Sequence, residues 1–146
     1  MNFARLEEQI CRDEGYRASP YLDTVEVPTI GYGTTRILGR PVSMNDPPLP
    51  EPIARHLLRA DLYLACMDAQ DLFETFGELN AVRREVLVNM AYNVGKTRLS
   101  RFENLIEAVD NLDYEEAALQ MEQSRWFRQV KQRGIRLRDA MLTGEW

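Results

Sequence analysis

Two carboxylates and a hydroxyl lie close together near the start of the chain, in the pattern Glu14-x8-Asp23-x5-Thr29. Cleavage of a glycosidic bond needs such a pair, because one carboxylic acid protonates the leaving oxygen while a second carboxylate supports the transition state or activates water. A hydroxyl nearby can hold that water by hydrogen bonds. Each residue also has a simpler interpretation: Glu14 as a surface acid, Asp23 as a turn former and Thr29 as an ordinary strand residue.

A predicted helix positions Glu14. Its apolar stripe, at three- and four-residue spacing, consists of Phe3, Leu6, Ile10 and Cys11. Continued by four residues the stripe reaches Glu14, and Gly15 is a good helix stop. We therefore expect Glu14 on the buried side of the last turn, where burial and the negative end of the helix dipole both disfavour ionisation. This environment suits a proton donor.

Asp23 and Thr29 fall in a β-rich segment, "YLDTVEVPTIGYGTTRIL". Its β-branched and aromatic residues, interrupted by proline and glycine, predict a small antiparallel sheet. Ala18–Pro20 is expected to turn the chain before this sheet, and Gly39-Arg40 is a plausible further turn. Asp23 would then lie in a polar hairpin region and stay ionised.

The chain then changes character at "NDPPLPEP", residues 45–52, which cannot be a helix interior and is interpreted as a linker between two lobes. A long amphipathic helix is expected next, as the connection to the second lobe. The apolar residues that predict it are Ile53, Leu57, Ala60, Leu64 and Met67.

The remainder of the chain is predicted to be helical. "AVRREVLVNMAYNVG" is strongly apolar and suits a central helix, and capping boxes at Ser100 with Glu103 and at Asp113 with Glu116 predict two shorter helices. "SRWFRQV" and "IRLRDAMLTG" supply the last helices. These patterns indicate an α+β fold in one domain, residues 1–146, with a β-containing lobe over about 15–50 and a helical lobe over about 77–146.

Composition excludes several classes of function. A net charge of −5 disfavours nucleic acid as the main partner, although the basic segment from Arg125 to Arg138 is either a solvated helix face or a patch for an anionic polymer. No apolar run is long enough for a membrane span. One histidine and two distant cysteines do not make a metal site, and free thiols at Cys11 and Cys66 are favoured over a disulfide.

The segment from Glu14 to "TIGYGTT" resembles the catalytic segment of phage-type lysozymes, glycoside hydrolase family 24, which includes T-even phage lysozymes and lambdoid endolysins. Three later blocks resemble the same family in the same order: "LNAVRREVLVNMAYNVG", "EEAALQMEQSRWF" and "LTGEW". Residues 36–76 depart most from it. The resemblance implies a lysozyme-like, mostly helical fold in which a long helix joins a small β-sheet lobe to a helical lobe.

The resemblance also implies roles for individual residues. Glu14 would be the general acid, with Asp23 and Thr29 activating and positioning water. Gly33 and Tyr92 would contact sugar, and Arg133 would pair with the catalytic glutamate. Tyr92 could equally be an aromatic core residue, and Arg133 could simply belong to the basic helix face.

Other positions match the family less directly. Thr34 stands where T-even lysozymes have a histidine, so the histidine–aspartate pair of those proteins cannot form here. Trp126 is expected in the core rather than at a ligand, and Asn89 is expected to brace the region between the lobes rather than take part in catalysis.

The implied activity is that of a muramidase, which hydrolyses the β-1,4 bond between N-acetylmuramic acid and N-acetylglucosamine without metal or cofactor. Its partner would be peptidoglycan glycan strands in a cleft between the lobes, and the protein would be a monomer. Because the N-terminus does not resemble a signal peptide, an endolysin in the host cytoplasm, released by a holin to the periplasmic wall, is expected. The alternative is a catalytically inactive wall-binding or virion structural module of the same fold.

Overall fold

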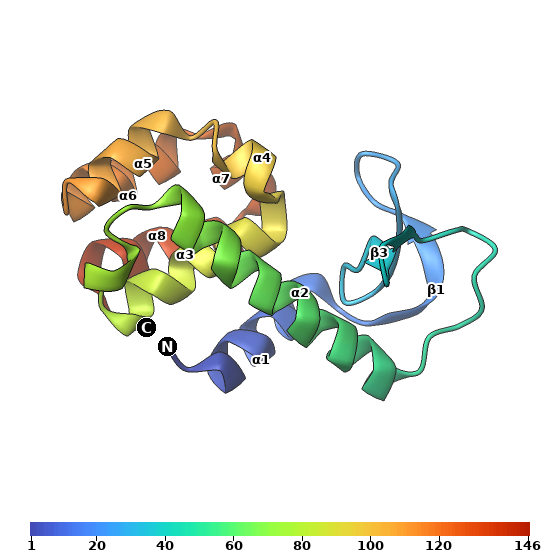
Figure 1. Cartoon of the computed structure of the whole chain (residues 1–146). Helices are drawn as coiled ribbons and strands as arrows, with labels where there is room; N and C mark the ends of the chain where they lie inside the picture. Colours follow the sequence, from blue (N-terminus) through green and yellow to red (C-terminus); the bar gives the residue numbers. More distant parts are fainter. The chain divides into compact units, whose positions relative to one another are not determined.

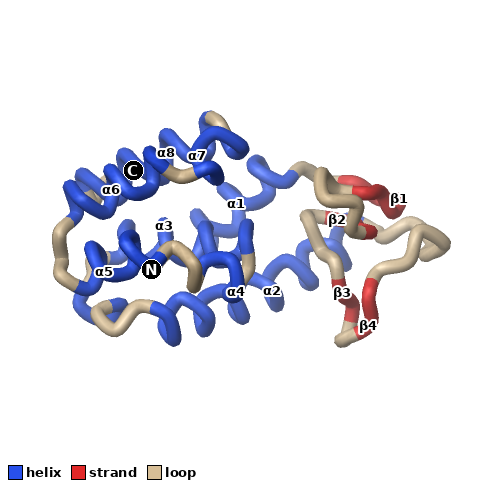
Figure 2. The backbone as a smooth tube through the Cα atoms, turned by 90° about the horizontal axis from the view of Figure 1, so that it is seen from above, coloured by secondary structure: helices blue, strands red, loops and turns tan.

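The computed structural model of the protein describes residues 1–146, and Figures 1 and 2 show that strands occur only in the first part of the chain. In chain order the elements are α1 (Phe3–Glu14), β1 (Arg17–Leu22), β2 (Pro28–Gly31), β3 (Arg36–Ile37), β4 (Arg40–Pro41), α2 (Glu51–Leu72), the short helix η1 (Phe76–Glu78), α3 (Ala81–Val94), α4 (Lys96–Leu99), α5 (Glu103–Asp110), α6 (Tyr114–Gln123), α7 (Arg125–Val130) and α8 (Gln132–Thr143). None of the helices is both long and apolar enough to cross a lipid bilayer.

The chain forms two compact units. The N-terminal unit is Phe3–Tyr63, and the C-terminal unit is Leu64–Trp146 together with Met1–Asn2. The boundary falls inside α2, which confirms the long helix as the connection between them. The proline-rich segment is non-helical up to Pro50, as predicted, but it lies within the N-terminal unit and is not a linker between lobes.

Helix α1 begins and ends as the sequence predicts. Leu6 and Ile10 are fully buried, and Gly15 ends the helix with a positive φ of 68° and a hydrogen bond from its N–H to the Cys11 carbonyl, 3.0 Å long. Phe3 is 44% exposed, so the buried stripe is shorter than expected. Glycine is suited to this position because residues with a β-carbon rarely adopt such a conformation.

An ion cluster fastens α1 to α2 within the N-terminal unit. The Glu7 carboxylate accepts hydrogen bonds from Arg55 Nη1 at 3.0 Å and from Arg59 Nε at 2.8 Å. The hydrogen bond from Arg59 lowers the pKa of Glu7, against the effect of its burial. Paired in this way, the mostly buried carboxylate keeps its charge.

Strands β1 and β2 form the predicted antiparallel hairpin, with Tyr21 opposite Thr29 and Leu22 opposite Pro28. The expected turn at Ala18–Pro20 is wrong, because these residues belong to β1. The pairing register shifts between Arg17 and Tyr21. Such an irregularity accommodates Pro20, which has no N–H to donate to a regular ladder.

A second hairpin joins β3 and β4. Its turn is Leu38–Gly39, both with positive φ, so the predicted turn at Gly39-Arg40 is displaced by one residue.

Helix α2 is the predicted long helix, but its buried face is not the one that the apolar stripe indicated. Its buried residues are Ala54, Leu58, Leu62, Ala65, Cys66 and Ala69. The stripe that predicted the helix lies on the opposite side, where Ile53, Leu64 and Met67 are about half exposed. The thiols of Cys11 and Cys66 are both free.

In the C-terminal unit, α3 is the central helix, with residues 85–91 buried, as its apolar sequence predicts. Asn80 caps its first turn by accepting the Arg83 N–H at 2.9 Å. The capping box at Asp113 is confirmed, because its carboxylate accepts the Glu116 N–H at 3.0 Å. The box at Ser100 is wrong: its hydroxyl donates to the Thr97 carbonyl, and α5 begins after Phe102 without a side-chain cap.

Asp61 on α2 is a partly buried acid beside a fully buried threonine in the N-terminal unit. The Thr34 hydroxyl donates to Asp61 Oδ2 at 3.4 Å. Thr34 is the residue that stands in place of the histidine of T-even lysozymes, so a threonine–aspartate hydrogen bond is found here and not a histidine–aspartate pair. Burial raises the pKa of Asp61 from 3.8 to about 6, and the hydrogen bond from Thr34 opposes this rise. No cation compensates for the burial of this acid, so its ionisation costs free energy in the fold.

We predict that Asp61 makes the protein less stable as pH rises from about 4 to about 6, because the folded state resists ionisation that the unfolded chain undergoes freely. Asp61→Asn should therefore raise the free energy of unfolding by on the order of 2 kcal/mol at pH 7, and by little at pH 3. Urea unfolding at both pH values measures the difference. Thr34→Val removes the hydrogen bond that lowers the pKa of Asp61, so the loss of stability should extend to higher pH. An equal effect of Asp61→Asn on the free energy of unfolding at both pH values would contradict the prediction.

Candidate active site

Glu14 is the last residue of α1 and lies against the turn that follows β2. A β-carbon placed on Gly33 would stand 3.1 Å from Glu14 Oε2 and 3.3 Å from its carboxyl carbon. Gly33 also has a φ of 81°, which favours glycine. The side chain of Glu14 is half-buried rather than fully buried. The Glu14 carboxylate therefore lies in space that is open because residue 33 has no side chain.

Asp23 follows β1 directly and organises the hairpin loop. Its Oδ1 accepts the N–H groups of Val25 at 2.9 Å and Val27 at 2.8 Å, while the Glu26 N–H is bonded to the Asp23 carbonyl. Asp23 is thus the turn former that the simpler interpretation proposed. Because both side-chain bonds fall on Oδ1, Oδ2 remains available as an acceptor.

Thr29 lies on β2 and is 3% exposed. Its hydroxyl donates to the Val27 carbonyl at 2.8 Å, so the single hydroxyl hydrogen is used within the hairpin. The oxygen keeps its lone pairs and can accept a hydrogen bond from another molecule.

Tyr21, opposite Thr29 on β1, links the two carboxylates electrostatically. Burial raises the pKa of the Tyr21 hydroxyl, the charges of Glu14 and Asp23 raise it as well, and Arg17 opposes them. The Arg17 guanidinium lies 4.3 Å from the centre of the Tyr21 ring. Both acids therefore lie within electrostatic range of one phenol. Sequence reasoning missed this residue, because an aromatic two positions before Asp23 looked like an ordinary strand former.

The N-terminal unit thus contains Glu14, Asp23, Thr29 and Gly33, four of the six predicted site residues. Tyr92, half-buried on α3, and Arg133 on α8 belong to the C-terminal unit. Arg133 is 8% exposed, and its Nε donates to Asn89 Oδ1 at 2.9 Å. Asn89 is fully buried, and its contact with this arginine lies within the C-terminal unit, so its expected role between the lobes stays a prediction. The expected partners of Tyr92 and Arg133 in the substrate and at Glu14 stay predictions.

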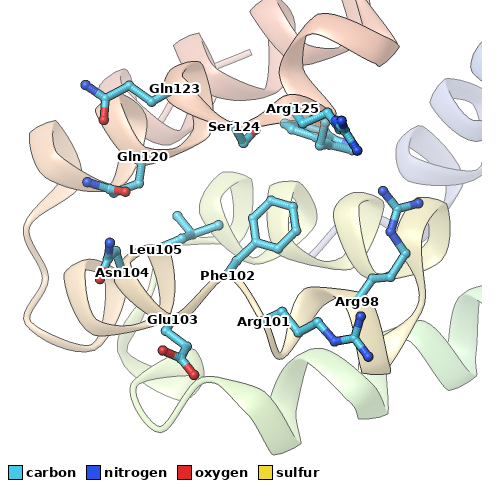
Figure 3. A pocket seen from close by; sticks show the side chains of 11 residues that line it. Arg98, Arg101, Phe102, Glu103, Asn104, Leu105, Gln120, Gln123, Ser124 and Arg125 are labelled. Atoms are coloured by element: carbon cyan, nitrogen blue, oxygen red, sulfur yellow. The ribbon is translucent and has the colours of Figure 1, made fainter.

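The C-terminal unit also carries an open cavity of about 450 Å³ (Figure 3). Arg98, Arg101 and Arg125 gather at one end, Gln120 and Gln123 lie at the other, and the Phe102 ring lies between them. The full lining is Arg98, Arg101, Phe102, Glu103, Asn104, Leu105, Gln120, Gln123, Ser124, Arg125 and Trp126.

The three arginines of this cavity are exposed, and none of their side chains forms an ion pair or hydrogen bond with the chain. Glu103 is the one acid in the lining. Trp126 is 2% exposed and donates from Nε1 to Asn93 Oδ1 at 2.8 Å, so it is a core residue, as predicted. A cavity with unneutralised arginines, amides and an aromatic ring can hold an anionic, amide-containing ligand.

This cavity divides the basic segment noticed in the sequence. Arg125 lines it, Arg133 is buried beside Asn89, and Arg138 pairs with Glu122 and Asp139. Arg98 and Arg101 come from a different part of the chain, so no sequence pattern predicted that they would join Arg125.

Comparison with known proteins decides the family, because the phage lysozyme family matches residues 12–141. The chain belongs to the phage lysozyme family. Membership confirms the α+β lysozyme-like fold and supports a lysozyme-like function.

Three similar proteins have low sequence identity to this member of the phage lysozyme family. The pre-baseplate central spike protein Gp5 of Enterobacteria phage T4 is 28% identical over 95% of this chain, and the chain spans only 28% of that protein. Probable T4-type lysozymes 1 and 2 of Dictyostelium discoideum are 25% and 24% identical, over 95% of this chain and 94% of each relative.

We predict that Gly33→Ala lowers any activity that depends on Glu14 by more than Gly39→Ala does, because the added methyl group would stand 3.1 Å from Glu14 Oε2 and shift the carboxylate by a few tenths of an ångström. Gly39→Ala is the matched control: its φ of 80° is almost the same, but nothing lies within 4 Å of its β-carbon. Both variants should lose about 1 kcal/mol or more of stability through backbone strain. Wall-lysis rates measured on the folded variants should separate them, and equal activity would contradict a role for the Glu14–Gly33 contact.

Proposed function

We propose that the protein is a muramidase that hydrolyses the β-1,4 bond between N-acetylmuramic acid and N-acetylglucosamine in peptidoglycan. The observation that carries this proposal is that the two carboxylate oxygens of Asp23 have different surroundings. One oxygen holds the hairpin loop through two backbone N–H groups, and the other faces no donor of the chain. A carboxylate fixed by one oxygen and open at the other suits the activation of water.

The hydrogen bond that Thr29 already makes defines its part in this mechanism. Since its hydrogen is donated to Val27, Thr29 Oγ1 acts on the water as an acceptor. A water that donates one hydrogen to Thr29 Oγ1 and the other to Asp23 Oδ2 presents a lone pair to the anomeric carbon. Glu14 gives its proton to the glycosidic oxygen as the bond to the leaving sugar breaks, and Asp23 takes the proton of the attacking water.

The substrate carries acidic peptides as well as sugars, and the cavity of the C-terminal unit suits them. Its three arginines are free to pair with carboxylates, and its asparagine and glutamines match peptide amides. We therefore propose that this cavity binds the stem peptide, while the chemistry takes place at Glu14 and Asp23. A local cation cluster also offsets the net charge of −5, which otherwise disfavours binding to an anionic wall.

A series at position 29 tests the mechanism. Thr29→Ser should keep much of the activity, and Thr29→Val should lose at least about a hundredfold, since valine keeps the shape but cannot accept a hydrogen bond. Glu14→Gln, which cannot donate the proton, sets the inactive baseline. The rate of turbidity loss of purified peptidoglycan measures all three. Equal activity of the serine and valine variants would reduce Thr29 to a strand residue, and full activity of a folded Glu14→Gln variant would remove Glu14 from the mechanism.

Separate substrates test the peptide cavity. Arg101→Gln should lower the rate on peptide-bearing peptidoglycan by about tenfold, which is the loss of about one charge-assisted hydrogen bond, and should not change the rate on glycan stripped of peptides by an amidase. Arg128→Gln, an exposed arginine of α7 outside the cavity, is the control. An equal loss on both substrates would contradict peptide binding there without affecting the proposed chemistry.

A second function is favoured by the relative that is named as a central spike protein. In this alternative the chain serves as a wall-binding or structural module of a virion, with or without catalysis. Binding of the purified chain to peptidoglycan without any loss of turbidity would support the inactive form of this alternative. The endolysin setting expected from the sequence stays a prediction.

A further inference from the structure

Tyr21 carries a hydroxyl group that forms no hydrogen bond with the chain. The residue is half-buried on β1, but its oxygen is open to solvent rather than buried without a partner. Tyr16, in the same unit, differs in this respect, because its hydroxyl donates to the Leu49 carbonyl. The Tyr21 hydroxyl is therefore available to another molecule.

The pairing of β1 with β2 places the Tyr21 side chain beside the proposed catalytic groups. Tyr21 is directly opposite Thr29, and side chains opposite one another in an antiparallel pair lie on the same face, with β-carbons about 5 Å apart. The Asp23 N–H donates to the Val27 carbonyl at 3.1 Å, which continues the pairing beyond Leu22. Because side chains alternate along a strand, that of Asp23 leaves the backbone on the same side as that of Tyr21.

The surroundings of the phenol keep it protonated and hold its ring in place. Its raised pKa, caused first by burial and then by the charge of Glu14, keeps the hydroxyl neutral at pH 7. The Arg17 guanidinium lies over the ring, 4.3 Å from its centre, and stabilises this position. Tyr21 therefore presents a hydrogen-bond donor in a defined place, on the same face of the hairpin as Thr29.

We propose that Tyr21 binds the substrate by donating its hydroxyl hydrogen to an oxygen of the amino sugar whose glycosidic bond is cleaved. This inference rests on the proposed function, because it takes Glu14 and Asp23 as the groups that act on that bond. A neutral donor suits the uncharged acceptors of such a sugar, which are its hydroxyl groups and its N-acetyl carbonyl. The contact would hold the anomeric carbon in line with the water bound by Asp23 and Thr29.

A purely structural role for Tyr21 would depend on its ring and not on its hydroxyl. The half-buried ring packs against Arg17 and contributes to the fold whether or not the oxygen contacts a sugar. Tyr21→Phe removes the oxygen alone. Because that oxygen has no partner in the chain, this variant should unfold at nearly the same urea concentration as the wild type.

Kinetics on purified peptidoglycan test the role of the hydroxyl. We expect Tyr21→Phe to lower kcat/KM about tenfold, equivalent to about 1.4 kcal/mol. Tyr16→Phe is the matched control: it removes a hydroxyl that is bonded within the fold, so it should lower the urea midpoint and leave kcat/KM of the folded protein unchanged. Equal kcat/KM for Tyr21→Phe and the wild type would overturn the proposal.

Binding to an inactive protein separates this contact from the proposed chemistry. The probe is a tetrasaccharide of alternating N-acetylglucosamine and N-acetylmuramic acid, titrated calorimetrically into Glu14→Gln. Adding Tyr21→Phe should raise the dissociation constant about tenfold, and adding Tyr16→Phe should not. An unchanged constant, or no binding at all, would overturn the contact even if the wild type hydrolyses the wall. Binding that depends on Tyr21, in a protein whose wild type does not hydrolyse peptidoglycan, would support the contact and contradict the proposed hydrolysis.

Discussion

The narrow space beside Gly33 is the constraint on which the proposed site depends. Glu14 lies in the last turn of α1. After the β1–β2 hairpin the chain returns to this carboxylate, and the residue that contacts it there is Gly33, which has no side chain. Position 33 favours glycine for two reasons: its backbone has a left-handed conformation, and a β-carbon there would crowd the Glu14 carboxylate. Any larger residue would have to displace the acid or the turn, so the local fold and the chemistry are coupled at this point.

Asp23 couples structure to chemistry in a second way. Its two interpretations, turn former and catalytic carboxylate, are compatible because a carboxylate has two oxygens. Oδ1 closes the hairpin loop, and this fixes the direction of Oδ2. Thr29, on the opposite strand, is fixed by its own bond to Val27. Groups held in this way lose little freedom when substrate binds, which is what preorganised catalysis requires.

Local signals predicted much of this fold, and longer-range packing decided the rest. Leu6 and Ile10 in the stripe of α1, the helix stop at Gly15, the β-hairpin and the cap at Asp113 depend on near neighbours, and these were confirmed. Pro20 was misjudged because the register shift that accommodates it depends on the partner strand. On α2 the sequence has apolar residues on two sides, so periodicity alone could not show that Ala54, Leu58 and Leu62 would be buried. The cavity arginines come from separate helices, and only the packing of the C-terminal unit joins them.

The central claim is that Asp23 and Thr29 place an external water, and the end group of the product tests it most directly. Mass spectrometry of muropeptides released from purified peptidoglycan distinguishes the two possible ends of the muramic acid. Hydrolysis gives a reducing end, which contains one water more than the 1,6-anhydro end formed when the sugar's own hydroxyl attacks. We predict reducing ends throughout. Predominantly anhydro ends would contradict the account even if lysis were rapid.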